Sequence, residues 1–380
     1  PGARPSMKFA LFYEIPVAQP WEQDSEYLAY QQVIEQAVAA DRLGFHAVWT
    51  VEHHFLDEYS HCSNPEVLYG AIAARTTNLR LGYGVRLMPA GYRHPIRTAE
   101  SVAVLDLISD GRVDVGTGRS STRLEMEGFA IDPYTTRDSW REAIEFTVGA
   151  WTNDVFSFDG EFFSMPARRV HPKPRQKPHP PLWGATGDAR NHRTVGELGL
   201  GLCSFAVATD PANVKQRIDA YREGIANCTQ PLGHFVNNQA STFTMVNVAP
   251  TAAEAREVAE ESFLWYPRRA VELVASVPAW MMEMDAQRSG DDRGLGSYEY
   301  LESAMETVSQ GLLDHLTMDY LIDSSACLCG DPETALAQAR EYEAAGVDLL
   351  LCLVNPYKIP HEKVMQTIEL MGAEVIPAFS

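Results

Sequence analysis

The sequence predicts a single α/β domain folded as a (β/α)8 barrel. The main observation is that eight short, apolar, β-rich runs alternate with segments of helical periodicity along almost the whole 380-residue chain. Strands that alternate with helices form right-handed βαβ units and therefore a parallel sheet. The second observation is their number, because eight such units favour a closed barrel over an open doubly wound sheet.

The predicted strands are the runs 7–15, 47–55, 79–89, 113–119, 182–187, 201–208, 242–250 and 347–356. The clearest helix lies between the first two strands and ends before Gly44, as helices often end before a glycine. Its apolar stripe consists of Leu28, Val33, Ile34, Ala37, Ala40 and Leu43. Further helices are expected near 65–77, 94–109 and 136–152. We place the domain at residues 7–380 and interpret residues 1–6, which precede Met7, as a cloning remnant.

Two connections are too long for a minimal barrel. The first covers about 153–181 and is rich in proline and basic residues. The second covers about 276–325, and its polar, glycine-bearing composition predicts a mobile loop. Because the loops after the strands carry the active site in this fold, the second connection is a candidate lid.

Charge and composition exclude several classes of partner. The chain has 31 Lys and Arg residues against 51 Asp and Glu residues, a net charge of −20, so it should repel nucleic acid and anionic lipid. No apolar run reaches membrane-spanning length, and nothing resembles a signal peptide. Of six cysteines only Cys327 and Cys329 are close, and C-x-C alone indicates neither a zinc knuckle nor a thioredoxin motif. We therefore expect a soluble, cytoplasmic protein.

The run AVWTVEHHF, residues 47–55, is a predicted strand that ends in one carboxylate and two imidazoles. Side chains alternate along a strand, so Glu52 and His54 should share one face while His53 takes the other. This arrangement is poor for a shared metal ion, and the chain lacks the H-x-H and H-E-x-x-H patterns, so no metal site is predicted. The pattern leaves open whether the two histidines are catalytic or structural.

Two further strand ends suggest an anion site. VGTGRSS contains G-x-G without the third glycine of the dinucleotide fingerprint, so Gly116 and Gly118 are better explained by a ligand lying close to the strand. Arg119 follows them and could clamp a phosphate. The turn at 187–189 could present backbone N–H groups to the same phosphate, although Asp188 could equally be a plain helix N-cap. A flat ligand with a phosphate tail, such as flavin mononucleotide (FMN), suits this arrangement.

These residues resemble a known family. The chain is similar from Met7 to its C-terminus to the bacterial luciferase-like family of flavin-dependent monooxygenases. The resemblance is carried by MKFALF, GFHAVWTVEHHF, LRLGYGVRLMPAGYRHPIRTAESVAVLDLISDGRVDVGTGR and GDPETALAQAREYEAAGVDLLLCLVNP. It implies a (β/α)8 barrel that binds reduced FMN and activates O2 as a C4a-(hydro)peroxyflavin to oxidise a small organic substrate.

The resemblance also implies roles for individual residues. His53 matches the catalytic histidine, flanked by Glu52 and His54, and its ordinary pKa of about 6.5 would let it donate and accept a proton. Gly84 and Val85 lie where the family often has a non-proline cis peptide. Gly118 replaces a reactive cysteine of luciferase, so light emission does not follow. The implied cofactor-binding residues are Gly84, Val85, Gly118, Arg119, Thr186, Gly187, Asp188, Ala189, Ser204 and Phe205.

No second domain for NAD(P)H is visible, so reduced flavin should come from a separate NAD(P)H:flavin reductase. The family commonly forms homodimers, and we expect one here. The sequence leaves the substrate open. Three alternatives to this function are a deazaflavin (F420)-dependent oxidoreductase of the same barrel, a non-catalytic luciferase-like subunit, and a metal-dependent barrel hydrolase.

Overall fold

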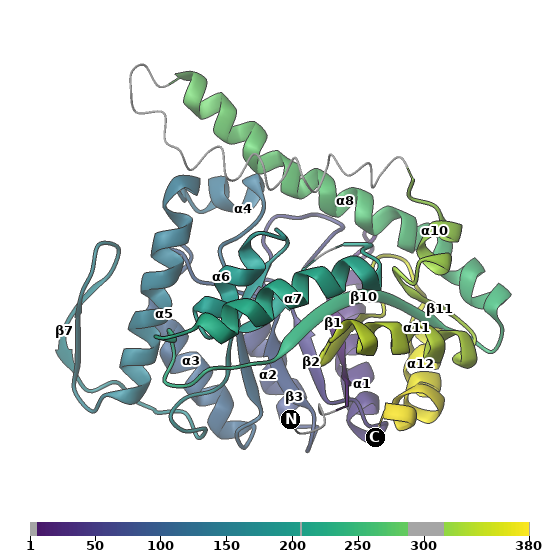
Figure 1. The fold of residues 1–380 in the computed structure, drawn as a ribbon, viewed down its shortest axis with the longest axis horizontal. Helices are drawn as coiled ribbons and strands as arrows, with labels where there is room; N and C mark the ends of the chain where they lie inside the picture. The colour runs from purple at the N-terminus through teal and green to yellow at the C-terminus, as the bar shows by residue number, and fades with distance from the viewer. Residues whose placement is uncertain (1–5, 206, 288–314, 380) are drawn as a thin grey trace.

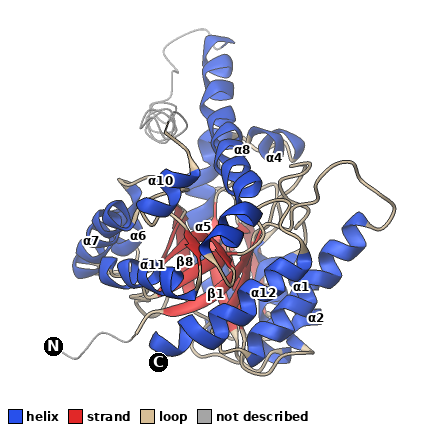
Figure 2. Ribbon diagram, turned by 90° about the vertical axis from the view of Figure 1, so that its right-hand side faces the viewer, coloured by secondary structure: helices blue, strands red, loops and turns tan. Residues whose placement is uncertain are grey.

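Eight parallel strands close into a barrel in the computed structural model, which describes residues 6–205, 207–287 and 315–379. Each predicted run overlaps one of them, although β10 begins two residues before its run. Their order around the ring follows the chain, with the last strand pairing with the first. The (β/α)8 barrel is therefore confirmed (Figures 1 and 2). The ring strands are β1 (Lys8–Tyr13), β2 (Ala47–Thr50), β3 (Arg80–Tyr83), β5 (Val113–Gly118), β8 (Leu182–Thr186), β9 (Gly201–Ser204), β10 (Ala240–Val248) and β12 (Leu349–Leu353).

Helices surround the strands (Figure 2), and the four helices predicted between 25 and 152 are present. The first ends at Arg42, and Gly44 has a positive φ of 85°. The helices are α1 (Ser25–Arg42), α2 (Pro65–Ala73), α3 (Pro95–Ile108), α4 (Arg123–Gly128), α5 (Thr136–Thr152), α6 (Asn191–Glu197), α7 (Pro211–Asn227), α8 (Ala252–Gln287), α10 (Met318–Asp323), α11 (Pro332–Ala345) and α12 (His361–Leu370). Short turns of other helix types cover Pro133–Thr135, Met371–Val375 and Ile376–Phe379. None of the described helices combines the length and apolarity needed to cross a bilayer.

Small strands extend the barrel at two places. Strand β4 (Arg86–Leu87) pairs with β5, and β11 (Leu328–Gly330) pairs with the far end of β10. The predicted long connection at 153–181 contains an antiparallel hairpin that the sequence pattern did not reveal, β6 (Phe156–Asp159) and β7 (Ser164–Arg168). It projects from the barrel beside α5 (Figure 1).

The prediction of a loop over about 276–325 is wrong for its first part. Residues 276–287 continue α8, and 288–314 lie outside the described residues. The helix continues because Val277 and Met281, one turn apart, are buried against Met126 and Ile131. Helix α8 thus crosses one end of the barrel beside α4 and α10 (Figure 2).

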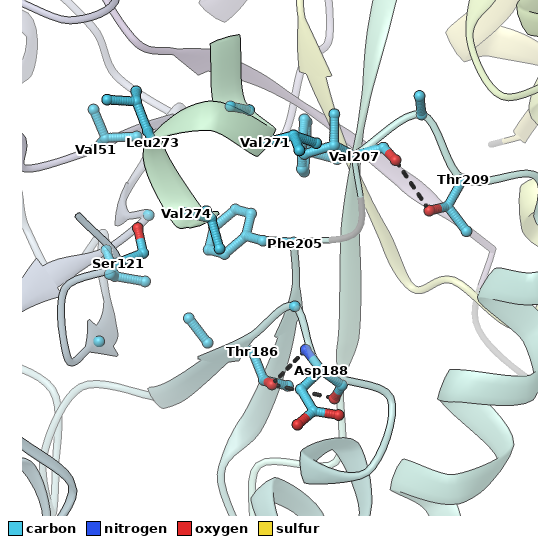
Figure 3. A pocket seen from close by; sticks show the side chains of 18 of the residues that line it. Val51, Ser121, Thr186, Asp188, Phe205, Val207, Thr209, Val271, Leu273 and Val274 are labelled. Carbon is cyan, nitrogen blue, oxygen red and sulfur yellow. Dashed lines mark hydrogen bonds between the residues drawn. The ribbon is translucent and has the colours of Figure 1, made fainter. Parts of the chain in front are cut away.

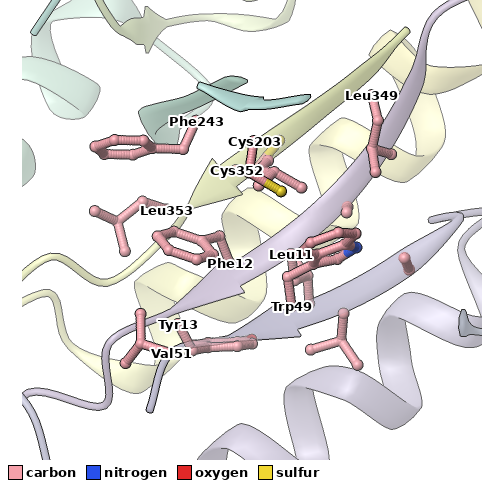
Figure 4. Packing of buried hydrophobic residues seen from close by; sticks show 14 of the residues in the cluster. Leu11, Phe12, Tyr13, Trp49, Val51, Cys203, Phe243, Leu349, Cys352 and Leu353 are labelled. Atoms are coloured by element: carbon pink, nitrogen blue, oxygen red, sulfur yellow. The ribbon is translucent and has the colours of Figure 1, made fainter. Parts of the chain in front are cut away.

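Large rings fill the barrel and require glycines opposite them. Trp49 and Trp183 meet edge to face at 5.3 Å, and both are buried. A Cβ at Gly116 would lie 1.9 Å from the carbonyl oxygen of Tyr83. The expectation that Gly116 makes room for a ligand is therefore wrong, because the neighbouring strand fills that space. Figure 4 shows part of this core, with Leu11, Trp49 and Cys203 among its labelled residues.

We predict that Gly116→Ala lowers the free energy of unfolding by about 2–3 kcal/mol, because its methyl group would overlap the Tyr83 carbonyl. The matched control is Gly70→Ala in α2, where a Cβ meets nothing within 4 Å. That change should raise the free energy of unfolding by about 0.5–1 kcal/mol, since alanine favours a helix over glycine. Denaturant unfolding of both variants measures the difference, and equal values for the two would contradict the packing described here.

Candidate active site

A cavity of about 490 Å³ opens at the carboxyl ends of the barrel strands and is partly covered by α8 (Figure 3). Its size is within the range of roughly 300–1,000 Å³ that is usual for ligand sites. Helix α8 contributes Val271, Leu273 and Val274 to the wall, so apolar side chains close this side of the cavity. The sequence-predicted residues that line it are Glu52, His53, Gly84, Val85, Gly118, Arg119, Thr186, Gly187, Asp188, Ala189 and Phe205.

His53 lies between two buried carboxylates. Its Nδ1 donates a hydrogen bond to Glu125 Oε1 at 2.8 Å, and its Nε2 lies 3.6 Å from Glu14 Oε2. The imidazole is 17 % exposed, whereas the two carboxylate side chains are 0 % and 4 % exposed. The sequence reasoning identified the histidine and missed both of its partners.

Glu125 is fixed by a hydrogen-bond network at the start of α4. It accepts bonds from the hydroxyls of Thr122 (2.7 Å) and Ser120 (3.0 Å) and from the backbone N–H of His54 (3.1 Å). The Thr122 hydroxyl in turn accepts from the backbone N–H of Glu125, which completes part of a capping box. The spacing T-x-x-E in the sequence could have located this helix start and its carboxylate.

These carboxylates hold His53 in its charged form. Burial alone would lower the pKa of His53, but the nearby Glu125, Glu14 and Glu52 raise it to about 9. The expected pKa of about 6.5 is therefore wrong for this residue. At neutral pH both ring nitrogens carry hydrogen, so His53 acts as a donor. The charge of His53 and its hydrogen bond together lower the pKa of Glu125, although burial opposes this.

Glu52, His53 and His54 follow β2, which ends at Thr50, so the strand alternation expected for these three residues does not extend to them. Glu52 accepts a hydrogen bond from the backbone N–H of Leu87 (3.1 Å) and pairs with Arg93. The Nε2 of His54 lies 3.6 Å from Glu52, and its ring packs on Phe129 at 4.8 Å. Glu52 lines the cavity, whereas His54 is not among the residues that line it. The Gly84–Val85 peptide beside them is cis, as the family resemblance implied.

The polar groups of the turn after β8 form hydrogen bonds with one another. The backbone N–H of Asp188 donates to the Thr186 hydroxyl at 3.1 Å (Figure 3), and the Asp188 carboxylate accepts from the N–H of Arg190 at 2.9 Å. Asp188 therefore stabilises the turn, but it is not the N-cap of α6 that the sequence allowed, because that position is occupied by Arg190. Arg217 of α7, which the sequence reasoning missed, lines the cavity and donates to the carbonyl oxygen of Gly187 at 2.8 Å. Arg119 also lines the cavity, so two guanidinium groups lie on its wall together with the carboxylates of Asp188 and Asp210.

Two other predicted residues have a different setting from the one expected. Ser204 is fully buried and is not among the residues lining the cavity; its hydroxyl bonds to Nε2 of His192 at 2.9 Å. Gly118 lines the cavity, but a Cβ there would lie 2.3 Å from Val85 Cγ2. The side chain of Val85, rather than a ligand, therefore lies close to this glycine. A cysteine at this position would displace Val85. The described ranges of the chain contain no group of three His, Cys, Asp or Glu side chains arranged to hold a metal ion.

The fold and this site define a (β/α)8-barrel enzyme with a buried proton donor and two arginine side chains in one cavity. The family model for luciferase-like monooxygenases matches residues 7–349, and the chain belongs to that family. Both the family resemblance and the prediction of a flavin-dependent monooxygenase are confirmed.

Individual relatives agree with this membership. The oxygenase component of the flavin-dependent trigonelline monooxygenase of Acinetobacter baylyi is 26 % identical over 98 % of this chain and 96 % of its own length. The oxygenating constituent of 3,6-diketocamphane monooxygenase from Pseudomonas putida, solved with FMN, is similar in fold with a TM-score of 0.75, 18 % identity and 99 % coverage of both chains. An F420-dependent secondary alcohol dehydrogenase has the same coverage and identity and a TM-score of 0.70.

We predict that Glu125→Gln shifts the titration of His53 from about 9 toward the ordinary histidine value, because it removes the charge that contacts Nδ1. A raised folded-state pKa means that His53 protonation stabilises the fold fully below about 6.5 and that this contribution is lost as pH rises through about 9. The free energy of unfolding of the variant should therefore decrease less than that of the wild type between about pH 6.5 and pH 9.

NMR titration of the His53 ring and urea unfolding at several pH values measure the two effects. The control is Glu127→Gln, which removes a carboxylate of the same helix that is 44 % exposed and pairs with Arg123. An unchanged His53 titration in Glu125→Gln would refute the assigned contact.

Proposed function

We propose that the protein is an FMNH2-dependent monooxygenase that uses O2 to oxidise a small organic substrate and receives reduced FMN from a separate reductase. One observation carries this proposal: His53 and Arg119 line the same cavity, and His53 is held there as a buried donor between two carboxylates. The trigonelline enzyme, named as an oxygenase component, supports a separate reductase.

The residues of the cavity fit FMN. Arg119 and Arg217 supply cationic donors for a phosphate, and a guanidinium matches phosphate oxygens in pairs. Val85, Phe205 and Phe12 offer apolar surface for a flat ring system, with Phe12 and Phe205 stacked at 5.7 Å. When bound, reduced FMN supplies the electrons that activate O2.

His53 is the proposed catalytic residue. Its raised pKa keeps a proton on Nε2 at neutral pH, on the side of the ring that faces Glu14 rather than Glu125. That proton can be donated to an oxygen atom in the cavity, and Glu125 holds the ring in place from Nδ1. The apolar side chains of α8 exclude water from the same space, and Leu273 and Val274 lie across the cavity from Thr186 (Figure 3).

An F420-dependent oxidoreductase is the second candidate, because a protein of that activity has the same fold over nearly its full length. It would transfer hydride without O2. The two candidates therefore differ in their requirement for O2. Homodimer formation and a cytoplasmic location stay predictions.

We predict that Arg119→Ala weakens FMN binding by about tenfold or more, while riboflavin, which lacks the phosphate, loses less than about threefold. Flavin fluorescence titration measures both affinities. Arg97→Ala is the control, since that arginine is 72 % exposed on α3 and pairs with Glu100. An equal loss of affinity for FMN and riboflavin would show that Arg119 does not bind the phosphate.

We also predict that His53→Ala retains FMN but lowers the product formed per FMNH2 consumed by about 10²- to 10⁴-fold, with the reducing equivalents lost as hydrogen peroxide. Product and peroxide are measured together, with His234→Ala, an exposed histidine outside the cavity, as the control. Wild-type coupling in His53→Ala would contradict the role. Turnover with F420 under strict anaerobiosis would favour the second candidate.

A further inference from the structure

Glu14 is a buried carboxylate that helps to raise the pKa of His53, and one of its oxygens has no role in the proposed proton transfer. It follows β1, lines the cavity and is 3 % exposed. Its Oε1 accepts hydrogen bonds from the hydroxyls of Tyr266 (2.8 Å) and Tyr59 (3.3 Å). Its Oε2 has no hydrogen-bond partner among the residues that the structure describes and lies 3.6 Å from Nε2 of His53. Because an unpartnered buried carboxylate oxygen is costly, this atom indicates that a ligand group belongs beside it.

His53 has more acidic partners than it can pair with closely. Glu14 and Glu125 flank one imidazole, which lies 2.8 Å from Glu125 and 3.6 Å from Glu14. Burial raises the pKa of Glu14, as expected of a carboxylate that lacks a sufficient positive partner. Arg119 and Arg217 also line the cavity, but the phosphate of the proposed FMN, with about two negative charges, matches them.

Aromatic rings surround the carboxylate. Tyr59 and Tyr266 are stacked with centroids 5.3 Å apart, and Phe243 meets Tyr266 edge to face at 6.2 Å. All three line the cavity. Aromatic faces next to a carboxylate attract weakly hydrated organic cations. A metal ion is a poorer match, since the described residues offer no group of three metal-ligating side chains.

We propose that Glu14, together with Tyr59 and Tyr266, binds a positively charged nitrogen group of the substrate, and that the substrates of this enzyme are small organic cations. The inference rests on the proposed function, because it concerns the substrate of the same site. Glu14 then determines specificity, whereas His53 supplies the proton.

The test uses two probes of nearly equal shape that differ in charge, the N,N,N-trimethylanilinium ion and tert-butylbenzene. Calorimetric titration of the FMN-loaded protein should show that the cation binds about tenfold or more tightly than its neutral counterpart. Glu14→Gln should abolish that preference and leave the affinity for tert-butylbenzene within about twofold of wild type. The control Glu26→Gln, at a carboxylate that is 72 % exposed, should keep the preference.

Equal binding of the two probes by the wild-type protein, or no binding of the cation, would overturn the proposal without any variant. Retention of the preference in Glu14→Gln would overturn it as well. Flavin titration of the wild type separates this outcome from the proposed function. If the protein binds FMN but does not discriminate between the probes, only the proposed substrate class is refuted. A protein that binds no FMN loses the proposed function, and the probes are then titrated into the protein as purified.

Discussion

The site depends on one buried arrangement, the imidazole of His53 between the carboxylates of Glu125 and Glu14. A charged group in an apolar cavity is stable only if opposite charges and hydrogen bonds replace its lost hydration. Glu125 supplies an opposite charge and a hydrogen bond at Nδ1, and it is itself held by hydrogen bonds from Thr122 and Ser120. The consequence is a proton donor with a fixed ring orientation at neutral pH. A histidine with its ordinary pKa would be mostly uncharged under the same conditions.

The barrel brings these groups together from distant parts of the chain. Glu14 follows the first strand, His53 follows the second, and Glu125 lies on the short helix after β5. Parallel strands direct all three toward the same end of the barrel. Helix α8 then covers that end, and its Tyr266 donates to Glu14. The same helix therefore closes the cavity and completes the polar environment of the carboxylate.

The sequence predicted the features that depend on local periodicity. Alternating strands and helices predicted the barrel. The two-residue repeat of a strand did not separate Glu52 from His53, because β2 ends at Thr50 and both side chains line the cavity. The sequence could not reveal Glu14 as a partner, because that contact joins residues 39 positions apart that meet only in the closed barrel. The helical state of residues 276–287 was missed because Val277 and Met281 are buried against Met126 and Ile131, which are distant in the sequence. The raised pKa of His53 was missed because it follows from its buried neighbours.

The most direct test of the central claim is a crystal structure of the protein with FMN bound. The account predicts that the isoalloxazine ring contacts the Nε2 side of His53 and that the phosphate contacts the guanidinium of Arg119. It also predicts that Glu125 keeps its hydrogen bond to Nδ1. A ring bound away from His53, or a phosphate that does not contact Arg119, would contradict it.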